Sequence, residues 1–158
     1  MFREMRRPKQ QLSREECIAV LKETKRGVLS LIGDNGFPYG IPLDHWYCEE
    51  DQKIYFHCAK EGHKIDALKA CDKASFCVID DGYRRDGEWA INFRSVVVFG
   101  RIRPVSGEAK TRLICSAITR KFTDDEAYLE KELKAFLPRV LCLELVPEHI
   151  SGKRVNES

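Results

Sequence analysis

Residues 28–47, VLSLIGDNGFPYGIPLDHWY, decide the fold. The first five form an apolar run rich in β-formers, and Asn35-Gly36 suits a tight hairpin turn because both residues accept a positive φ. The segment from Pro38 to Tyr47 then predicts a return strand. Its prolines, Pro38 and Pro42, place that strand at an edge of the sheet, or turn their missing donors away from the ladder, because proline cannot donate a ladder hydrogen bond.

Further β-type segments follow this hairpin. We expect strands at residues 53–59, 74–79, 89–105 and 139–146, the last closed by Pro147. We expect helices at 13–25, 62–71, 107–120 and 124–136, the first beginning with a Ser13–Glu16 capping box, and an exposed loop at 80–88. The strands do not alternate with long helices. The order therefore predicts a mainly β, α+β chain built on a small antiparallel barrel of about six strands.

Length and composition limit the classes of protein to consider. The chain has 158 residues and 43% hydrophobic residues, which suits one domain over 1–158 with a basic N-terminal arm at 1–12 and a C-terminal tail at 148–158. Lys and Arg number 27 against 25 Asp and Glu, so the net charge of +2 gives no general case for nucleic-acid binding. No apolar run approaches the ~20 residues that span a bilayer, and the charged N-terminus does not resemble a signal peptide. We expect neither a nucleic-acid nor a membrane partner.

The seven cysteines are scattered and form no CxxC motif. An odd, irregular set argues against a secreted disulfide scaffold and favours a reducing cytoplasm. A metal site can be assembled on paper from His45, Cys48, His57, Cys58 and His63. Its spacing matches no standard zinc pattern, so we expect no metal.

Residues 55–64, YFHCAKEGHK, carry the clearest chemical signal. A strand ends, Gly62 turns the chain, and a helix begins with His63 and Lys64. A helix N-terminus offers free N–H groups and a positive dipole end, and Lys64 adds a full charge. This turn predicts a phosphate-binding site. Taken alone, the segment also fits an ordinary strand–helix turn with a solvated Lys and His. The dinucleotide fingerprint, the P-loop, HExxH and GxSxG are all missing from the sequence.

Two other segments could approach a ligand. GFPYGIPL at 36–43 combines glycines, which let a flat ligand approach the backbone, with prolines, which keep the chain extended. Taken alone, the segment favours a hairpin edge that its prolines protect from aggregation. RSVVVFGR at 94–101 places Ser95 at the start of a central strand, where its hydroxyl could meet a ligand or make a routine backbone hydrogen bond.

Taken in order, these segments resemble the FMN-binding split-barrel proteins related to pyridoxamine 5'-phosphate oxidase, and within them the 5-nitroimidazole reductase-like, nitroimidazole-resistance branch. The resemblance spans roughly residues 1–153, including Ile150-Ser151-Gly152-Lys153. It implies a six-stranded antiparallel split β-barrel that forms a homodimer with FMN at the interface. True pyridoxamine phosphate oxidases carry a C-terminal strand with Trp and Arg residues. This chain lacks an equivalent, so the resemblance does not extend to vitamin B6 oxidation.

The resemblance also implies roles for individual residues. Backbone groups of Ile41, Pro42 and Leu43 would lie along the flavin ring, and His57, Cys58 and Ala59 would line the adjoining strand. His63 and Lys64 would bind the phosphate. Ser95 differs from the oxidases, which commonly carry at this position a glutamine that contacts the flavin. In all, the predicted cofactor-binding residues are Ile41, Pro42, Leu43, His57, Cys58, Ala59, His63, Lys64 and Ser95.

The expected function is FMN-dependent reduction of small electrophiles such as nitroaromatic compounds, with a small-molecule electron acceptor as substrate. His57 is the expected catalytic residue, since an imidazole can orient an acceptor or donate a proton. A nicotinamide electron donor is compatible with this fold, although no nicotinamide motif is present. The rival hypothesis is a non-catalytic flavin or haem carrier or sensor, whose haem would need an axial ligand from His45, His57 or His63.

Overall fold

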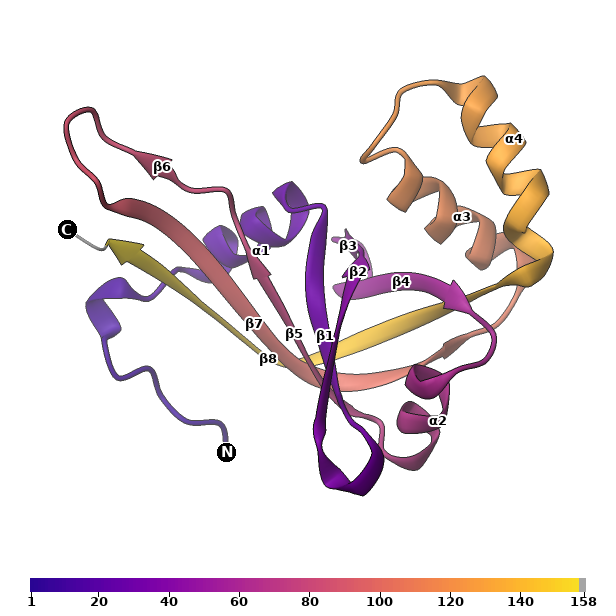
Figure 1. Cartoon of the computed structure of the whole chain (residues 1–158), viewed down its shortest axis with the longest axis horizontal. Coiled ribbons are helices and arrows are strands. Elements are labelled where there is room, and N and C mark those ends of the chain that lie inside the picture. Colours follow the sequence, from indigo (N-terminus) through magenta and orange to yellow (C-terminus); the bar gives the residue numbers. More distant parts are fainter. Residues whose placement is uncertain (157–158) are drawn as a thin grey trace.

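The computed structural model describes residues 1–156 and contains one eight-stranded antiparallel sheet. The strands are β1 (Arg26–Ile32), β2 (Pro38–Asp44), β3 (Trp46–Cys48), β4 (Lys53–Ala59), β5 (Lys73–Ile79), β6 (Tyr83–Arg84), β7 (Ile91–Val105) and β8 (Val140–Asn156). The helices are α1 (Arg14–Glu23), α2 (His63–Ala70), α3 (Glu108–Thr119) and α4 (Glu126–Phe136), with 3-10 turns η1 (Pro8–Gln10), η2 (Asp34–Gly36) and η3 (Leu137–Arg139). β7 and β8 run through the whole length of the molecule (Figure 1).

The sheet curls because its two edges are joined by a single residue. The strand order is β2-β1-β5-β7-β8-β4-β3, with β6 paired only to β7. β2 and β3 lie at opposite ends of this order, yet only His45 separates them in the chain. The antiparallel sheet therefore closes into a split barrel with attached helices, as predicted. The strand number is eight, where we expected six, because the 38–47 segment divides at His45 and the 80–88 loop contains the short β6.

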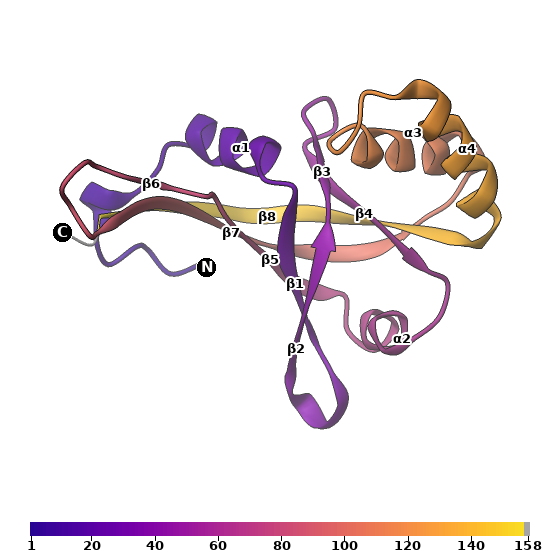
Figure 2. The same cartoon turned by 45° about the horizontal axis from the view of Figure 1, so that its top comes forward.

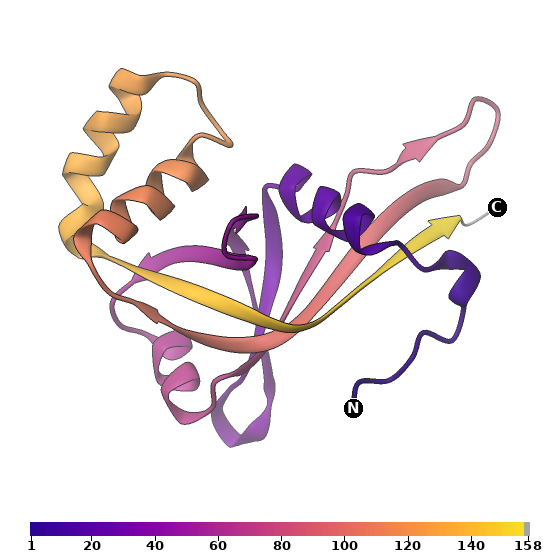
Figure 3. The same cartoon turned by 180° about the vertical axis from the view of Figure 1, so that it is seen from behind.

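The predicted start of α1 is confirmed in detail. The Glu16 N–H donates to Ser13 Oγ at 3.1 Å, and the Ser13 N–H donates to the Glu16 carboxylate at 2.8 Å. This reciprocal capping box satisfies two otherwise unpaired donors. The helix buries Cys17, Val20 and Leu21 and lies across β7 and β8, as the view from behind shows (Figure 3).

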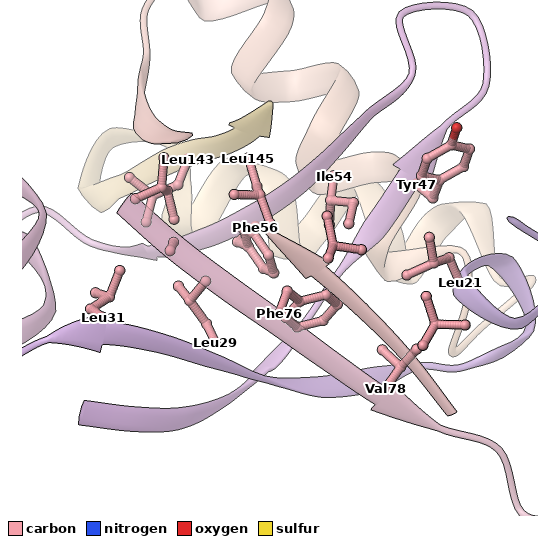
Figure 4. Close-up of a cluster of buried hydrophobic side chains, with 14 of the residues drawn as sticks. Leu21, Leu29, Leu31, Tyr47, Ile54, Phe56, Phe76, Val78, Leu143 and Leu145 are labelled. Carbon is pink, nitrogen blue, oxygen red and sulfur yellow. The ribbon is translucent and has the colours of Figure 1, made fainter. Parts of the chain in front are cut away.

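The described residues form two apolar cores. The larger fills the barrel, where Leu29, Phe56 and Phe76 pack together from three different strands (Figure 4). The smaller lies where the α3–α4 hairpin covers β4 and β8 (Figure 2), and it includes Tyr55 and Leu133. The hairpin that we expected to serve core or dimer packing therefore buries one face within the chain.

The last strand is longer than the sequence suggested. We expected a strand that ends at Pro147 and a tail at 148–158, but β8 continues to Asn156. The pairing register shifts between Phe99 and Gly100, so that Gly100 faces Pro147 and Phe99 faces His149. Such a bulge lets the strand pass a residue without an N–H donor.

The outer face of the sheet carries an apolar row. Pro42, Val28, Cys77 and Val97 are directly opposite one another across β2, β1, β5 and β7. Residues paired in this way share a face, and Val28 is 43% exposed. Within residues 1–156 no helix is long and apolar enough to cross a membrane.

Candidate functional site

Strand β4 distributes the predicted site residues over two faces. Phe56 belongs to the barrel core and Cys58 packs against it, whereas Tyr55 belongs to the core beneath α3 and α4. His57 lies on this second side, with its ring centroid 6.1 Å from that of Phe136 on α4. The alternation of side chains along a strand therefore separates His57 from Cys58.

The surroundings of His57 favour its neutral imidazole. Burial lowers its pKa, because desolvation disfavours the charged form, and the nearby Asp44 carboxylate opposes the shift only in part. No side-chain hydrogen bond of His57 is present among residues 1–156. A neutral ring offers one N–H donor and one acceptor nitrogen to a ligand.

The beginning of α2 provides a cationic, partly open turn. Gly62 has a φ of 123°, and the N–H groups of Ile65 and Asp66 both donate to its carbonyl. A Cβ at Gly62 would meet nothing within 4 Å. Throughout the described chain, the N–H groups of His63 and Lys64 find no acceptor. These unpaired donors and the helix dipole suit an anion.

Lys64 and His63 differ in how firmly they are held. Lys64 makes no ion pair within residues 1–156. Its charge lowers the pKa of the Cys58 thiol, but burial of the thiol has the larger effect and raises that pKa. The His63 ring stacks on Tyr39 with centroids 4.0 Å apart, and its Nε2 lies 3.8 Å from the Asp34 carboxylate. The β1–β2 hairpin therefore fixes His63, while Lys64 remains available to a ligand.

The β2 residues lie on both faces of their strand. Ile41 and Leu43 pack against the barrel core, whereas Pro42 is exposed opposite Val28. Ser95 lies elsewhere, on β7 between Ile79 of β5 and Lys153 of β8. It lines neither of the two cavities described below, so the single chain does not bring Ser95 together with His57.

One cavity contains predicted residues and another does not. The smaller, of about 330 Å³, is lined by His57, Cys58, Ala59, Phe136, Arg139 and Val140. The larger, of about 650 Å³, lies between the end of α1 and the β6–β7 hairpin. Its Arg94 side chain is already paired with Asp80 and Glu23. The smaller cavity therefore brings together three of the predicted residues, while His63, Lys64 and the β2 residues do not line it.

Sequence reasoning missed Phe136 and Arg139 as site residues. Phe136 was interpreted as a packing residue of a helix, and Arg139 as the beginning of the last strand. Leu137-Pro138 breaks the helix at this point, and the pairing of Ala59 with Val140 then places the turn beside β4. Pro138 was the one sequence signal for a turn after the helix, but it did not indicate that this turn lies beside β4.

His45, which we considered as a haem or metal ligand, already uses its Nε2 in a hydrogen bond within the chain. It is fully buried, and its Nε2–H donates to the Leu21 carbonyl at 2.7 Å. In the described part of the chain, no group of three or more His, Cys, Asp or Glu side chains is arranged to hold a metal ion.

Comparison with known proteins places the chain in a family. The family model described as pyridoxamine 5'-phosphate oxidase matches residues 13–154. The chain belongs to the pyridoxamine 5'-phosphate oxidase family. The resemblance proposed from the sequence is thereby confirmed at the level of this family, while no curated protein matches the chain significantly.

Solved structures of related proteins share the split-barrel fold. A protein from Bacteroides thetaiotaomicron, assigned to 5-nitroimidazole antibiotic resistance, is 15% identical with a TM-score of 0.75, over 92% of this chain and 87% of the other. A FAD-binding protein from Mesorhizobium loti is 26% identical with a TM-score of 0.65, over 92% and 95% of the two chains. A FAD- and haem-binding protein from Mycobacterium smegmatis is 22% identical with a TM-score of 0.72, over 94% and 74%.

Proposed function

We propose that this chain is a flavoprotein that binds FMN and reduces small electrophiles such as nitroaromatic compounds. The observation that carries the proposal is the unpaired cationic turn at the beginning of α2, next to the end of β4, in a chain of this family. The nitroimidazole-resistance and FAD-binding relatives support the same cofactor class and acceptor class.

The residues present fit the phosphate of a flavin nucleotide. The N–H groups of His63 and Lys64 and the Lys64 ammonium form a donor set to which no carboxylate of residues 1–156 is bonded. Charge-assisted donors of this kind suit a phosphate dianion. Residues Ile41 to Leu43 of β2 and His57 to Ala59 of β4 would line the ring and its side chain. When bound, the flavin supplies the two-electron redox chemistry.

His57 is the proposed catalytic residue. Its neutral imidazole lies in the cavity beneath α4 and can donate one N–H to an oxygen of the acceptor. Replacement of His57 by Ala should reduce turnover of a nitroaromatic acceptor at least about tenfold while flavin content is retained. Turnover by the loaded variant equal to that of the wild type would remove His57 from the mechanism.

We also propose a homodimer with the flavin at its interface and a location in the reducing cytoplasm. The apolar outer row on β2, β1, β5 and β7 supports the dimer, because Val28 and Ile79 are left exposed by the described part of the chain. Seven free cysteines support the reducing compartment. A nicotinamide cofactor is the proposed electron donor.

Charge reversal at α2 tests the cofactor site. Lys64→Glu should weaken FMN binding about tenfold or more, because one charge-assisted contact contributes ~1.5–3 kcal/mol. Lys69→Glu reverses a charge at the exposed far end of the same helix and should leave the affinity almost unchanged. The measurement is fluorescence titration of FMN into protein stripped of cofactor.

The purified protein provides the decisive control. Its absorbance spectrum, recorded without added cofactor, and the mass of the released ligand distinguish FMN from FAD and from haem. A colourless protein that also fails to take up added FMN contradicts the proposal. A Soret band would instead support the rival carrier or sensor function, with His57 or His63 as axial ligand, because the His45 side chain is fully buried.

A further inference from the structure

The cavity beneath the end of α4 is lined by three segments of the chain. His57 and Ala59 come from β4, Phe136 comes from α4, and Val140 comes from the start of β8. The His57 and Phe136 rings lie at only 25° to each other. A volume of about 330 Å³ is at the small end of the range for ligand pockets and suits a single-ring compound.

Two cationic side chains without an ion-pair partner among residues 1–156 lie at this cavity. Arg139 lines it, and its Nη2 donates to the Ala135 carbonyl at 3.1 Å. Lys60 donates to the carbonyl of the neighbouring Pro138 at 2.9 Å. Among residues 1–156 no carboxylate lies within ion-pair distance of either cation, although Arg94, Arg101, Arg103, Arg112, Arg120 and Arg154 are all paired.

The remaining polar group of the cavity complements these charges. Burial favours the neutral form of the His57 ring, so the ring adds no third cation beside the exposed Arg139 and Lys60, and it can accept or donate one hydrogen bond. The rest of the wall is apolar or aromatic. A ligand that fits must therefore be flat, mostly apolar and negatively charged at one end, where a guanidinium can pair with it bidentately.

We propose that this cavity binds a small planar carboxylate, with Arg139 pairing the carboxylate and Phe136 and His57 packing against the flat body. Lys60 adds positive potential at the rim. Arg139 then selects anionic over neutral acceptors of similar shape. The assignment of this ligand as the electron acceptor rests on the proposed function, whereas the binding site itself stands on the cavity, the two cations and the aromatic walls.

Calorimetric titration of the full-length protein tests the site without turnover. The probes are para-nitrobenzoate and its neutral analogue para-nitrobenzamide. We expect the wild type to bind the carboxylate about tenfold more tightly than the amide, the effect of one charge-assisted contact. Arg139→Gln should abolish this preference and leave the affinity for the amide unchanged. Arg139→Lys, which keeps the charge without the planar fork, should retain part of it.

Lys134→Gln is the matched control, because it removes a charge from the exposed last turn of α4 outside the cavity. It should keep the full preference. Equal affinity of the wild type for both probes, no binding of either, or an undiminished preference in Arg139→Gln overturns the proposal. Flavin content is recorded for every sample. A protein that binds FMN but lacks the preference refutes this site alone, and a protein that shows the preference but takes up no added FMN refutes the cofactor proposal alone.

Discussion

At His45 the chain passes from one edge of the sheet to the other with the imidazole fully buried. Its Nε2–H donates to Leu21, while its Nδ1 has no hydrogen-bond partner in the described chain. The nearby Lys121 ammonium donates to the His45 carbonyl at 2.6 Å. Burial, assisted by this positive charge, lowers the pKa of His45 to about 4.

This depressed pKa makes stability depend on acidity. Between pH 4 and 6.5 the unfolded chain binds a proton at His45 that the folded chain does not bind, so stability is lost as the pH falls through this window. We expect His45 to contribute a loss of about 2 kcal/mol between pH 7 and pH 5. Urea unfolding of the wild type and of His45→Gln at both values measures it.

The glutamine keeps an N–H donor but does not titrate, so the variant should be less stable overall and should lose less stability on acidification. His149→Gln changes a histidine outside the core and should follow the wild type. Equal losses in His45→Gln and wild type would show that folding does not depress the pKa of His45, and would contradict this prediction.

Individual elements show where local sequence is sufficient. The Ser13–Glu16 box defines the beginning of α1, and the predicted strand at 53–59 coincides with β4. Capping and alternation act over a few residues, so a single sequence carries them. The predicted end of the last strand was wrong, because we interpreted Pro147 as the residue that terminates it, whereas β8 continues to Asn156. The bulge opposite Gly100 depends on a partner strand, and a Cβ at Gly100 would lie 2.2 Å from the Val146 carbonyl oxygen.

At the scale of the whole molecule, the uncovered outer face of the barrel bears on assembly. Val28 lies within the apolar row, and Ile79 and Phe99 on the same face are 58% and 40% exposed. Exposed apolar surface of this kind marks association sites. We expect a dimer of twice 18.3 kDa in solution, measured by light scattering during size exclusion.

Val28→Lys should convert this dimer largely to monomer, because it places a charge in the middle of the apolar row and removes a side chain whose burial contributes about 1.5–3 kcal/mol. Leu113→Lys is the matched control, since Leu113 is 49% exposed on α3, away from this face. A monomeric wild type, or a Val28→Lys variant that remains fully dimeric, would exclude this face as the interface.

The candidate site was only half visible in the sequence. The strand–turn–helix at 55–64 could be identified from Gly62 and Lys64, since that chemistry is local. Its separation into a Lys64 turn and a His57 cavity could not, because β4 alternates between two cores that are formed by distant segments. Phe136 and Arg139 were hidden for the same reason.

By itself, the sequence determined the family, the antiparallel split barrel, the capped helix α1 and the cationic beginning of α2. Each of these follows from turn chemistry, capping or hydrophobic alternation within a short segment. Only the tertiary structure decided that His57 faces Phe136 and Arg139, that Ser95 lies apart from them, and that β8 continues past Pro147. These depend on the register of β4 and β7 against β8. Register between strands far apart in the chain is set by the packing of the whole sheet rather than by local preference.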